Sequence, residues 1–152
     1  MTVQPDITPV EAADYPRILE VWEASVRATH HFVAESDIVF FRPIVRDVLP
    51  HVPMACMRDE TGQAVGFVGV NNQHIEMLFV HPDWRGQGIG RRLLTHAIQQ
   101  MGGTSLDVNE QNEQAVGFYL KMGLVVVGRS EVDGMGKPYP LLHLRVAADG
   151  RE

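Results

Sequence analysis

Three glycines at alternate positions, Gly86, Gly88 and Gly90, separate an apolar run from a segment with helical spacing. Arg85 and Arg91 stand on either side of them. The start of a helix carries free backbone N–H groups and the positive end of the helix dipole, and glycines in front of it let an anion approach the backbone closely. The segment therefore suits a phosphate-binding loop, although glycines there can also serve only to form a tight turn.

Two familiar phosphate-binding patterns do not fit this segment. A P-loop requires Gly-Lys-Ser or Gly-Lys-Thr, and neither follows these glycines. A dinucleotide fingerprint places Gly-x-Gly-x-x-Gly directly at the end of a strand, whereas here "HPDWR" intervenes and the glycine spacing differs.

Composition limits the classes of protein that remain. The 152 residues, 45% of them hydrophobic, suit a single domain over residues 1–152 with a real core. The formal net charge of −6 argues against broad nucleic-acid binding, although a local basic patch remains compatible with it. No apolar run approaches the roughly 20 residues of a membrane span, and the N-terminus lacks a signal-peptide pattern. We therefore expect a cytoplasmic protein with no nucleic-acid or membrane partner.

The hydrophobic pattern predicts helices and strands in alternation. Thr8-Pro9-Val10-Glu11 has the form of a capping box, which predicts a first helix from there to about His30. A second helix is expected over 38–48, where Pro43 forces a kink or a late start. Segments 54–58, 64–70 and 74–80 are typical of an antiparallel meander.

The rest of the chain follows the same pattern. After the glycines we expect a helix to about Gly102, then the elements 104–109 (strand), 112–122 (helix), 124–132 (strand) and 140–146 (strand). A helix between strands 74–80 and 104–109 implies that these two strands run parallel. The predicted fold class is α/β (α+β), with one mixed, mostly antiparallel sheet flanked by helices.

Two motifs resemble those of a known family. The run Arg85-Gly86-Gln87-Gly88-Ile89-Gly90 resembles the Arg/Gln-x-x-Gly-x-Gly/Ala signature of the GNAT acetyltransferases. Residues 112–124 resemble the family's Asn-x-x-Ala-x-x-Phe-Tyr-x-x-x-Gly-Phe block, with Leu124 where Phe is usual. The resemblance spans essentially the whole chain, and segments 109–119 and 128–142 together look especially like the small bacterial YjaB-type branch. It implies the GNAT fold, in which the parallel strands splay apart.

The resemblance implies acetyl-CoA as the donor substrate. No metal is expected, because the histidines are scattered along the chain without a recognisable ligand spacing. The pyrophosphate is expected on backbone N–H groups from Gln87 to Arg91, and the pantetheine amides along the edge of strand 74–80. Asn112 matches a pantetheine-binding position but also suits a helix N-cap, and Asn109 is a weaker candidate. The implied cofactor-binding residues are Leu78, Phe79, Val80, Arg85, Gln87, Gly88, Ile89, Gly90, Arg91, Asn109, Asn112 and Tyr119.

Amine acetylation needs a neutral amine, a polarised thioester carbonyl and a proton for the departing thiolate. The resemblance assigns Tyr119 as the general acid and the Val80 N–H as the carbonyl's donor. Tyr119 also shares helical spacing with Val116, which suits a core aromatic instead.

His74 and Glu76 are the candidate bases. Strand alternation predicts that they share a face with Leu78. The opposite face is then expected to carry Ile75, Met77 and Phe79. His74 stands where histone-acetylating members have glutamate, and an imidazole can take a proton near neutral pH. A solvated polar pair, with only water as base, is the alternative.

His30 and His31 follow the first helix, where family members build the acceptor pocket. They are candidate substrate-binding residues, although histidines at a helix C-terminus also complement its dipole. The sequence thus predicts an acetyl-CoA-dependent N-acetyltransferase acting on a primary amine of a small molecule or a protein. The alternative is an acetyl-CoA-binding sensor or regulatory module without turnover. Monomer and homodimer both remain open.

Overall fold

A computed structural model gives the structure of residues 2–147. They form two compact units, the first ending at Gly103 and the second beginning at Thr104. A single domain over residues 1–152 stays a prediction. No helix in residues 2–147 is long and apolar enough to cross a membrane.

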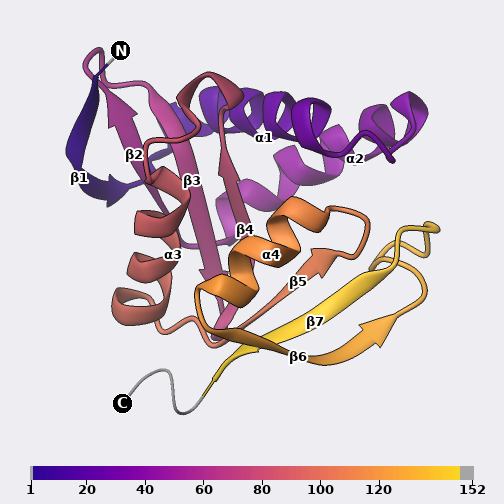
Figure 1. The fold of residues 1–152 in the computed structure, drawn as a ribbon. Coiled ribbons are helices and arrows are strands. Elements are labelled where there is room, and N and C mark those ends of the chain that lie inside the picture. The colour runs from indigo at the N-terminus through magenta and orange to yellow at the C-terminus, as the bar shows by residue number, and fades with distance from the viewer. Residues whose placement is uncertain (1, 148–152) are drawn as a thin grey trace. The chain divides into compact units, whose positions relative to one another are not determined.

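The first unit is built on four antiparallel strands (Figure 1). They are, in spatial order, β1 (Val3–Pro9), β2 (Met54–Asp59), β3 (Ala64–Asn71) and β4 (His74–Val80). The last three confirm the predicted meander. A tight turn with positive φ at Asn72 (51°) and Gln73 (68°) joins β3 to β4, as two-residue hairpin turns require.

Helices cover both faces of β3, which is buried over 64–70. On one face Phe67 joins a buried cluster with side chains of α1 (Tyr15–Thr29) and α2 (Glu35–Val48). On the other face a Cβ on Gly66 would lie 2.9 Å from Ile89 Cγ2 in α3 (Ile89–Gln100). The bare backbone at Gly66 therefore lets α3 pack closely on the sheet.

The second unit has three antiparallel strands and one helix. Its elements are β5 (Ser105–Asn109), α4 (Glu113–Lys121), β6 (Leu124–Ser130) and β7 (Leu141–Val146), with β7 between β5 and β6. Leu106, Leu124 and Leu144 are at most 2% exposed and form its apolar side. The predicted strands and helix are confirmed, with ends that differ by one or two residues.

The expected start of the first helix is wrong, one strand was not predicted, and a late start of the second helix, one of two alternatives, does not occur. Thr8 and Pro9 belong to strand β1, which was not predicted because its segment is polar and contains two prolines. The cap lies three residues later, where the Glu11 N–H donates to the Asp14 carboxylate at 2.8 Å. Pro43 does not delay α2, which already begins at Glu35.

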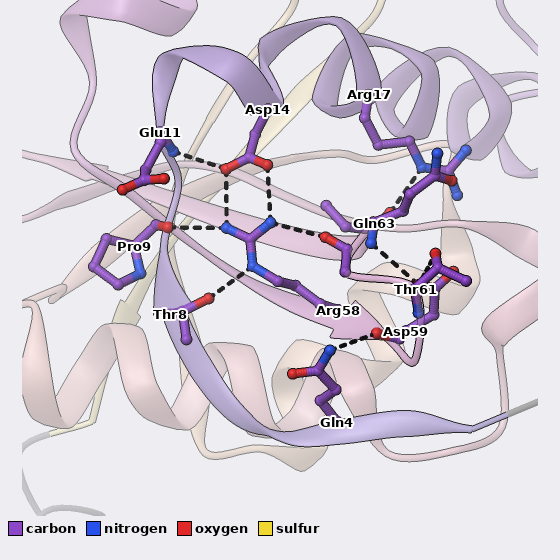
Figure 2. A network of polar contacts seen from close by, with 12 residues as sticks. Gln4, Thr8, Pro9, Glu11, Asp14, Arg17, Arg58, Asp59, Thr61 and Gln63 are labelled. Atoms are coloured by element: carbon purple, nitrogen blue, oxygen red, sulfur yellow. Dashed lines mark hydrogen bonds and ion pairs between the residues drawn. The ribbon is translucent and has the colours of Figure 1, made fainter.

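Arg58 of β2 ties β1 and the following turn to the sheet (Figure 2). Its guanidinium donates to both carboxylate oxygens of Asp14, at 2.8 and 2.9 Å. It also donates to the Thr8 hydroxyl and to the carbonyls of Pro9 and Gly62. The two charged side chains are only 18% and 17% exposed, and the Arg58 hydrogen bonds hold the pKa of Asp14 below its usual value.

We expect Asp14→Asn to lower the free energy of unfolding by about 2 kcal/mol, because it removes charge-assisted hydrogen bonds from a largely buried arginine. The matched control is Asp47→Asn, since Asp47 is 73% exposed beside Arg46, and it should change stability by less than about 0.5 kcal/mol. Denaturant unfolding measures both. Equal effects in the two variants would contradict a special role for the Arg58 network.

Candidate functional site

The glycine loop precedes α3 and is exposed from Arg85 to Gly88. Gly86 and Gly88 both have φ of 76°, in the left-handed region that disfavours any side chain with a Cβ. Gly88 is the N-cap of α3, and Ile89, the first helical residue, is only 3% exposed. The buried Ile89 thus anchors the helix start while the backbone before it stays open.

The start of α3 offers both donors and positive charge. The first hydrogen bond of the helix runs from the Arg92 N–H to the Gly88 carbonyl at 3.1 Å, so the N–H groups of Ile89, Gly90 and Arg91 have no partner within the helix. The Arg92 guanidinium donates to the carbonyl of Pro5 in β1. The side chains of Arg85 and Arg91 make no hydrogen bond or ion pair with any residue in 2–147. This arrangement is suited to an anion.

The register between β3 and β4 slips by one residue at Glu76. Gly69 lies opposite Met77, whereas the next residue, Val70, lies opposite Ile75. Strand β4 therefore contains a β-bulge, with Glu76 as the extra residue.

The bulge divides the apolar residues of β4 between two faces. Met77 and Phe79 pack against the cluster of α1 and α2. Ile75 is 3% exposed and faces Gly103, whose Cβ would lie 2.7 Å from Ile75 Cγ1. The expectation that all three share one face is therefore wrong, because alternation does not continue through a bulge.

The polar face predicted for β4 is wrong for the same reason. His74 pairs with Asn71 and Leu78 pairs with Val68. Since Asn71 and Val68 are three residues apart on a regular strand, His74 and Leu78 lie on opposite faces. Glu76 is exposed and His74 is half-buried, so they are two separate candidates rather than one polar surface.

His30 caps the C-terminus of α1, with its N–H donating to the Val26 carbonyl at 2.7 Å. The Thr29 hydroxyl donates its only proton to the Ser25 carbonyl, so it must accept a hydrogen bond from His30 Nδ1 at 2.7 Å. The Nε2 atom then carries the lone pair. Burial, with the neighbouring His31, lowers the pKa of His30 to about 4, so its imidazole is neutral at pH 7.

Thr29 is the residue that the sequence reasoning missed, because a threonine beside a histidine carries no signal without the helix geometry. His31 is exposed and does not share the burial of His30. The two histidines thus have different environments, and only His30 is held as a neutral hydrogen-bond acceptor.

In the second unit Asn112 is the N-cap of α4, and its Oδ1 accepts from the Ala115 N–H at 3.3 Å. The N-cap interpretation is therefore confirmed. Asn109 ends β5, and its carbonyl accepts from the Asn112 N–H at 3.0 Å. A cofactor role for either asparagine stays a prediction.

Tyr119 has a buried ring, with 9% of the residue exposed, as a core aromatic would have. Burial raises the pKa of its phenol, which keeps it protonated at neutral pH. Its hydroxyl has no hydrogen bond within residues 2–147, yet no fully buried side-chain polar atom in that range lacks a partner. The hydroxyl therefore retains some contact with solvent.

Residues 51–136 match a family model described as an acetyltransferase (GNAT) domain, which is more than half of the chain. The chain belongs to the GNAT acetyltransferase family. It is 46% identical over 128 residues to the peptidyl-lysine N-acetyltransferase YjaB of Salmonella typhimurium, covering 84% of this chain and 88% of that relative.

Solved structures of GNAT proteins share the fold. The solution structure of apo-form YjaB from Escherichia coli matches with a TM-score of 0.86 and 42% identity, covering 97% of this chain and 99% of that one. The PaiA N-acetyltransferase of Thermoplasma acidophilum, in complex with coenzyme A, matches in fold with a TM-score of 0.72 at 17% identity, over 97% of this chain and 100% of that one. The predicted family, fold class and enzyme class are confirmed, and this GNAT protein is an acetyltransferase.

The burial of His30 predicts a pH dependence of stability. Its folded pKa of about 4 lies below the ordinary 6.5, so between these values the unfolded chain binds a proton that the folded chain does not. Acidification through this range therefore lowers the free energy of unfolding. We expect the melting temperature of His30→Asn to depend less on pH than that of the wild type between about pH 6.5 and pH 4. The His31→Asn variant, changed at an exposed position, should keep most of the wild-type slope. Parallel slopes in wild type and His30→Asn would contradict the burial of a neutral imidazole.

Proposed function

We propose that the chain transfers the acetyl group of acetyl-CoA to the side-chain amine of a lysine in a protein or peptide. The observation that carries the proposal is the start of α3, where Gly88 opens the backbone and three N–H groups lack helical partners. Beside them lie two arginines that form no ion pair with the described residues 2–147. Membership of the GNAT family supports acetyl-CoA as the donor. The peptidyl-lysine acceptor is supported by the name of the relative that is 46% identical.

The pyrophosphate of the cofactor binds the backbone from Gln87 to Arg91, with Arg85 and Arg91 supplying positive charge. The pantetheine arm binds the backbone of Leu78, Phe79 and Val80, and Asn109 and Asn112 contribute from the second unit. On this proposal residues 1–152 act as one N-acetyltransferase domain. The coverage of 97% of the chain by one solved relative supports this reading.

In the chemical step the Val80 N–H polarises the thioester carbonyl, the amine attacks, and Tyr119 protonates the departing CoA thiolate. A buried ring positions the hydroxyl, which is protonated at neutral pH and therefore has a proton to donate.

The amine must lose a proton before or during attack, and two separate groups can take it. Glu76 is exposed at the bulge of β4 and His74 is half-buried at the strand's start. His30 and His31 contribute to acceptor binding, His30 through the lone pair on Nε2.

The competing function is a module that binds acetyl-CoA without turnover. Steady release of CoA thiol in the presence of a lysine-containing peptide distinguishes the two. A binding module gives no release with any amine, whereas the proposed enzyme also acetylates the peptide at the lysine Nε.

We expect Gly88→Val to weaken acetyl-CoA binding at least about tenfold, since it removes access to N–H groups that make charge-assisted hydrogen bonds. Gly62→Val is the matched control, because Gly62 also has a positive φ, of 90°, but lies in the turn between β2 and β3. Both variants place a β-branched residue at a positive φ, so both should lose stability. Calorimetry on the folded fractions measures the affinity for acetyl-CoA. Equal affinity in Gly88→Val and wild type would contradict a role of the glycine loop in binding acetyl-CoA.

We expect Tyr119→Phe to fold and to bind acetyl-CoA, but to lose roughly 10²-fold or more in kcat, the usual scale for a positioned acid. Single-turnover acetylation of a lysine peptide measures the chemical step. The control is Tyr15→Phe, which removes the hydroxyl of a tyrosine packed against the core of the first unit and should leave kcat unchanged. A normal single-turnover rate together with a lowered melting temperature in Tyr119→Phe would show a packing role only.

A further inference from the structure

Three polar side chains on neighbouring strands of the second unit form a hydrogen-bonded chain. His143 of β7 lies between Asp107 of β5 and Ser130 of β6. The distance from His143 Nδ1 to Asp107 Oδ1 is 2.5 Å, and from His143 Nε2 to Ser130 Oγ it is 2.6 Å. The residues are far apart in sequence, so no sequence motif indicates this cluster.

The chemistry of the three groups fixes the direction of the hydrogen bonds. An ionised carboxylate only accepts, so His143 donates its Nδ1–H to Asp107. In a neutral imidazole Nε2 then holds the lone pair, and the Ser130 hydroxyl donates to it. A nucleophile bonded to a base, with the base oriented by a third group, is the arrangement that activates a serine for covalent catalysis.

The backbone of β6 brings Ser130 to this position. Val126 pairs with Leu144 and Gly128 pairs with His143, so Val127 is the extra residue of a β-bulge. The bulge moves Gly128, and with it Ser130 two residues later, to the face that carries His143. Without it Val127 would stand opposite the imidazole.

Gly128 also fixes where the imidazole ring can lie. A Cβ at this position would come within 3.3 Å of His143 Cδ2, so a side chain here would have to displace the ring by a few tenths of an ångström. Asp107 is the direct cross-strand neighbour of His143 on the other side. The ring is thus held between two strands and points its Nε2 at Ser130.

The cluster is accessible to a small substrate. The side chains of Asp107 and His143 are 36% and 35% exposed, and Ser130 is half-buried. The face is opposite to the one on which Leu106 and Leu144 are buried, because Asp107 and His143 alternate with these residues along their strands.

We propose that Ser130 is a nucleophile for acyl transfer from small activated esters, with His143 as its general base and Asp107 as the residue that orients His143. Ser130 Oγ attacks the ester carbonyl while its proton moves to His143 Nε2. The C–O bond to the leaving group then breaks, and the leaving oxygen takes the proton from His143. The products are an acyl ester of Ser130 and a free alcohol, and water attack with the same proton transfers releases the acid and regenerates Ser130.

The test uses the full chain and p-nitrophenyl acetate, an activated acetate ester. Release of p-nitrophenol is followed by absorbance, and the acetylated residue is identified by mass spectrometry after acid quenching. We expect acetylation of Ser130 roughly 10²-fold faster than of Ser36, a serine on the exposed part of α2 that has no histidine partner. His143→Gln and Asp107→Asn should both slow it, whereas Ser130→Ala should abolish the adduct and retain acetylation of lysine peptides by acetyl-CoA.

The same experiment distinguishes a nucleophilic Ser130 from a cluster that only stabilises the sheet. If the three residues only join the strands, the variants lower the melting temperature and Ser130 reacts no faster than Ser36, which overturns the proposal. Acetylation of Ser130 at an unchanged rate in folded His143→Gln also overturns it. Should His143→Gln not fold, the comparison of Ser130 with Ser36 in the unmodified chain still decides, since it needs no variant.

Discussion

The contact between Ile89 and the bare backbone of Gly66 is the constraint on which the rest of the first unit depends. A Cβ at Gly66 would meet Ile89 Cγ2 at 2.9 Å, Leu93 Cδ1 at 3.1 Å and the Phe79 carbonyl at 3.3 Å. The first turn of α3 and the end of β4 therefore converge on one glycine of β3. This packing fixes the helix start against the sheet and leaves the exposed glycine loop and the N–H groups of the first helical turn to meet a ligand.

The distribution of charge also favours ligand binding at the glycine loop in front of α3. The chain is acidic overall, with a formal net charge of −6, and its surface arginines mostly hold carboxylates, as Arg27 does with Glu23 and Glu35. Arg85 and Arg91 make no such pair among residues 2–147. Positive charge that no carboxylate of residues 2–147 neutralises thus lies beside N–H groups without helical partners, which is the electrostatic requirement for binding a phosphate.

Two β-bulges, one in each unit, determine how Glu76 of β4 and Ser130 of β6 are oriented on their strands. In β4 the bulge at Glu76 exposes that carboxylate and sends His74 and Leu78 to opposite faces. In β6 the bulge at Val127 carries Ser130 to the face of His143. Both act by the same geometry, since one inserted residue reverses the alternation of every side chain beyond it.

The sequence by itself determined most helices and strands, the antiparallel meander and the glycine loop, because hydrophobic periodicity and glycine spacing are local properties of the chain. Gly88 was identified from the glycine spacing, whereas Tyr119 was identified only through the resemblance of residues 112–124 to a family motif. Strand β1 was missed because its polar segment Val3–Pro9 becomes a strand only by pairing with β2. Tertiary structure alone decided the two faces of β4, the neutral state of His30 and the chain from Asp107 to Ser130. Bulges depend on the partner strand, and burial and cross-strand hydrogen bonds depend on residues distant in sequence, so no local pattern records them.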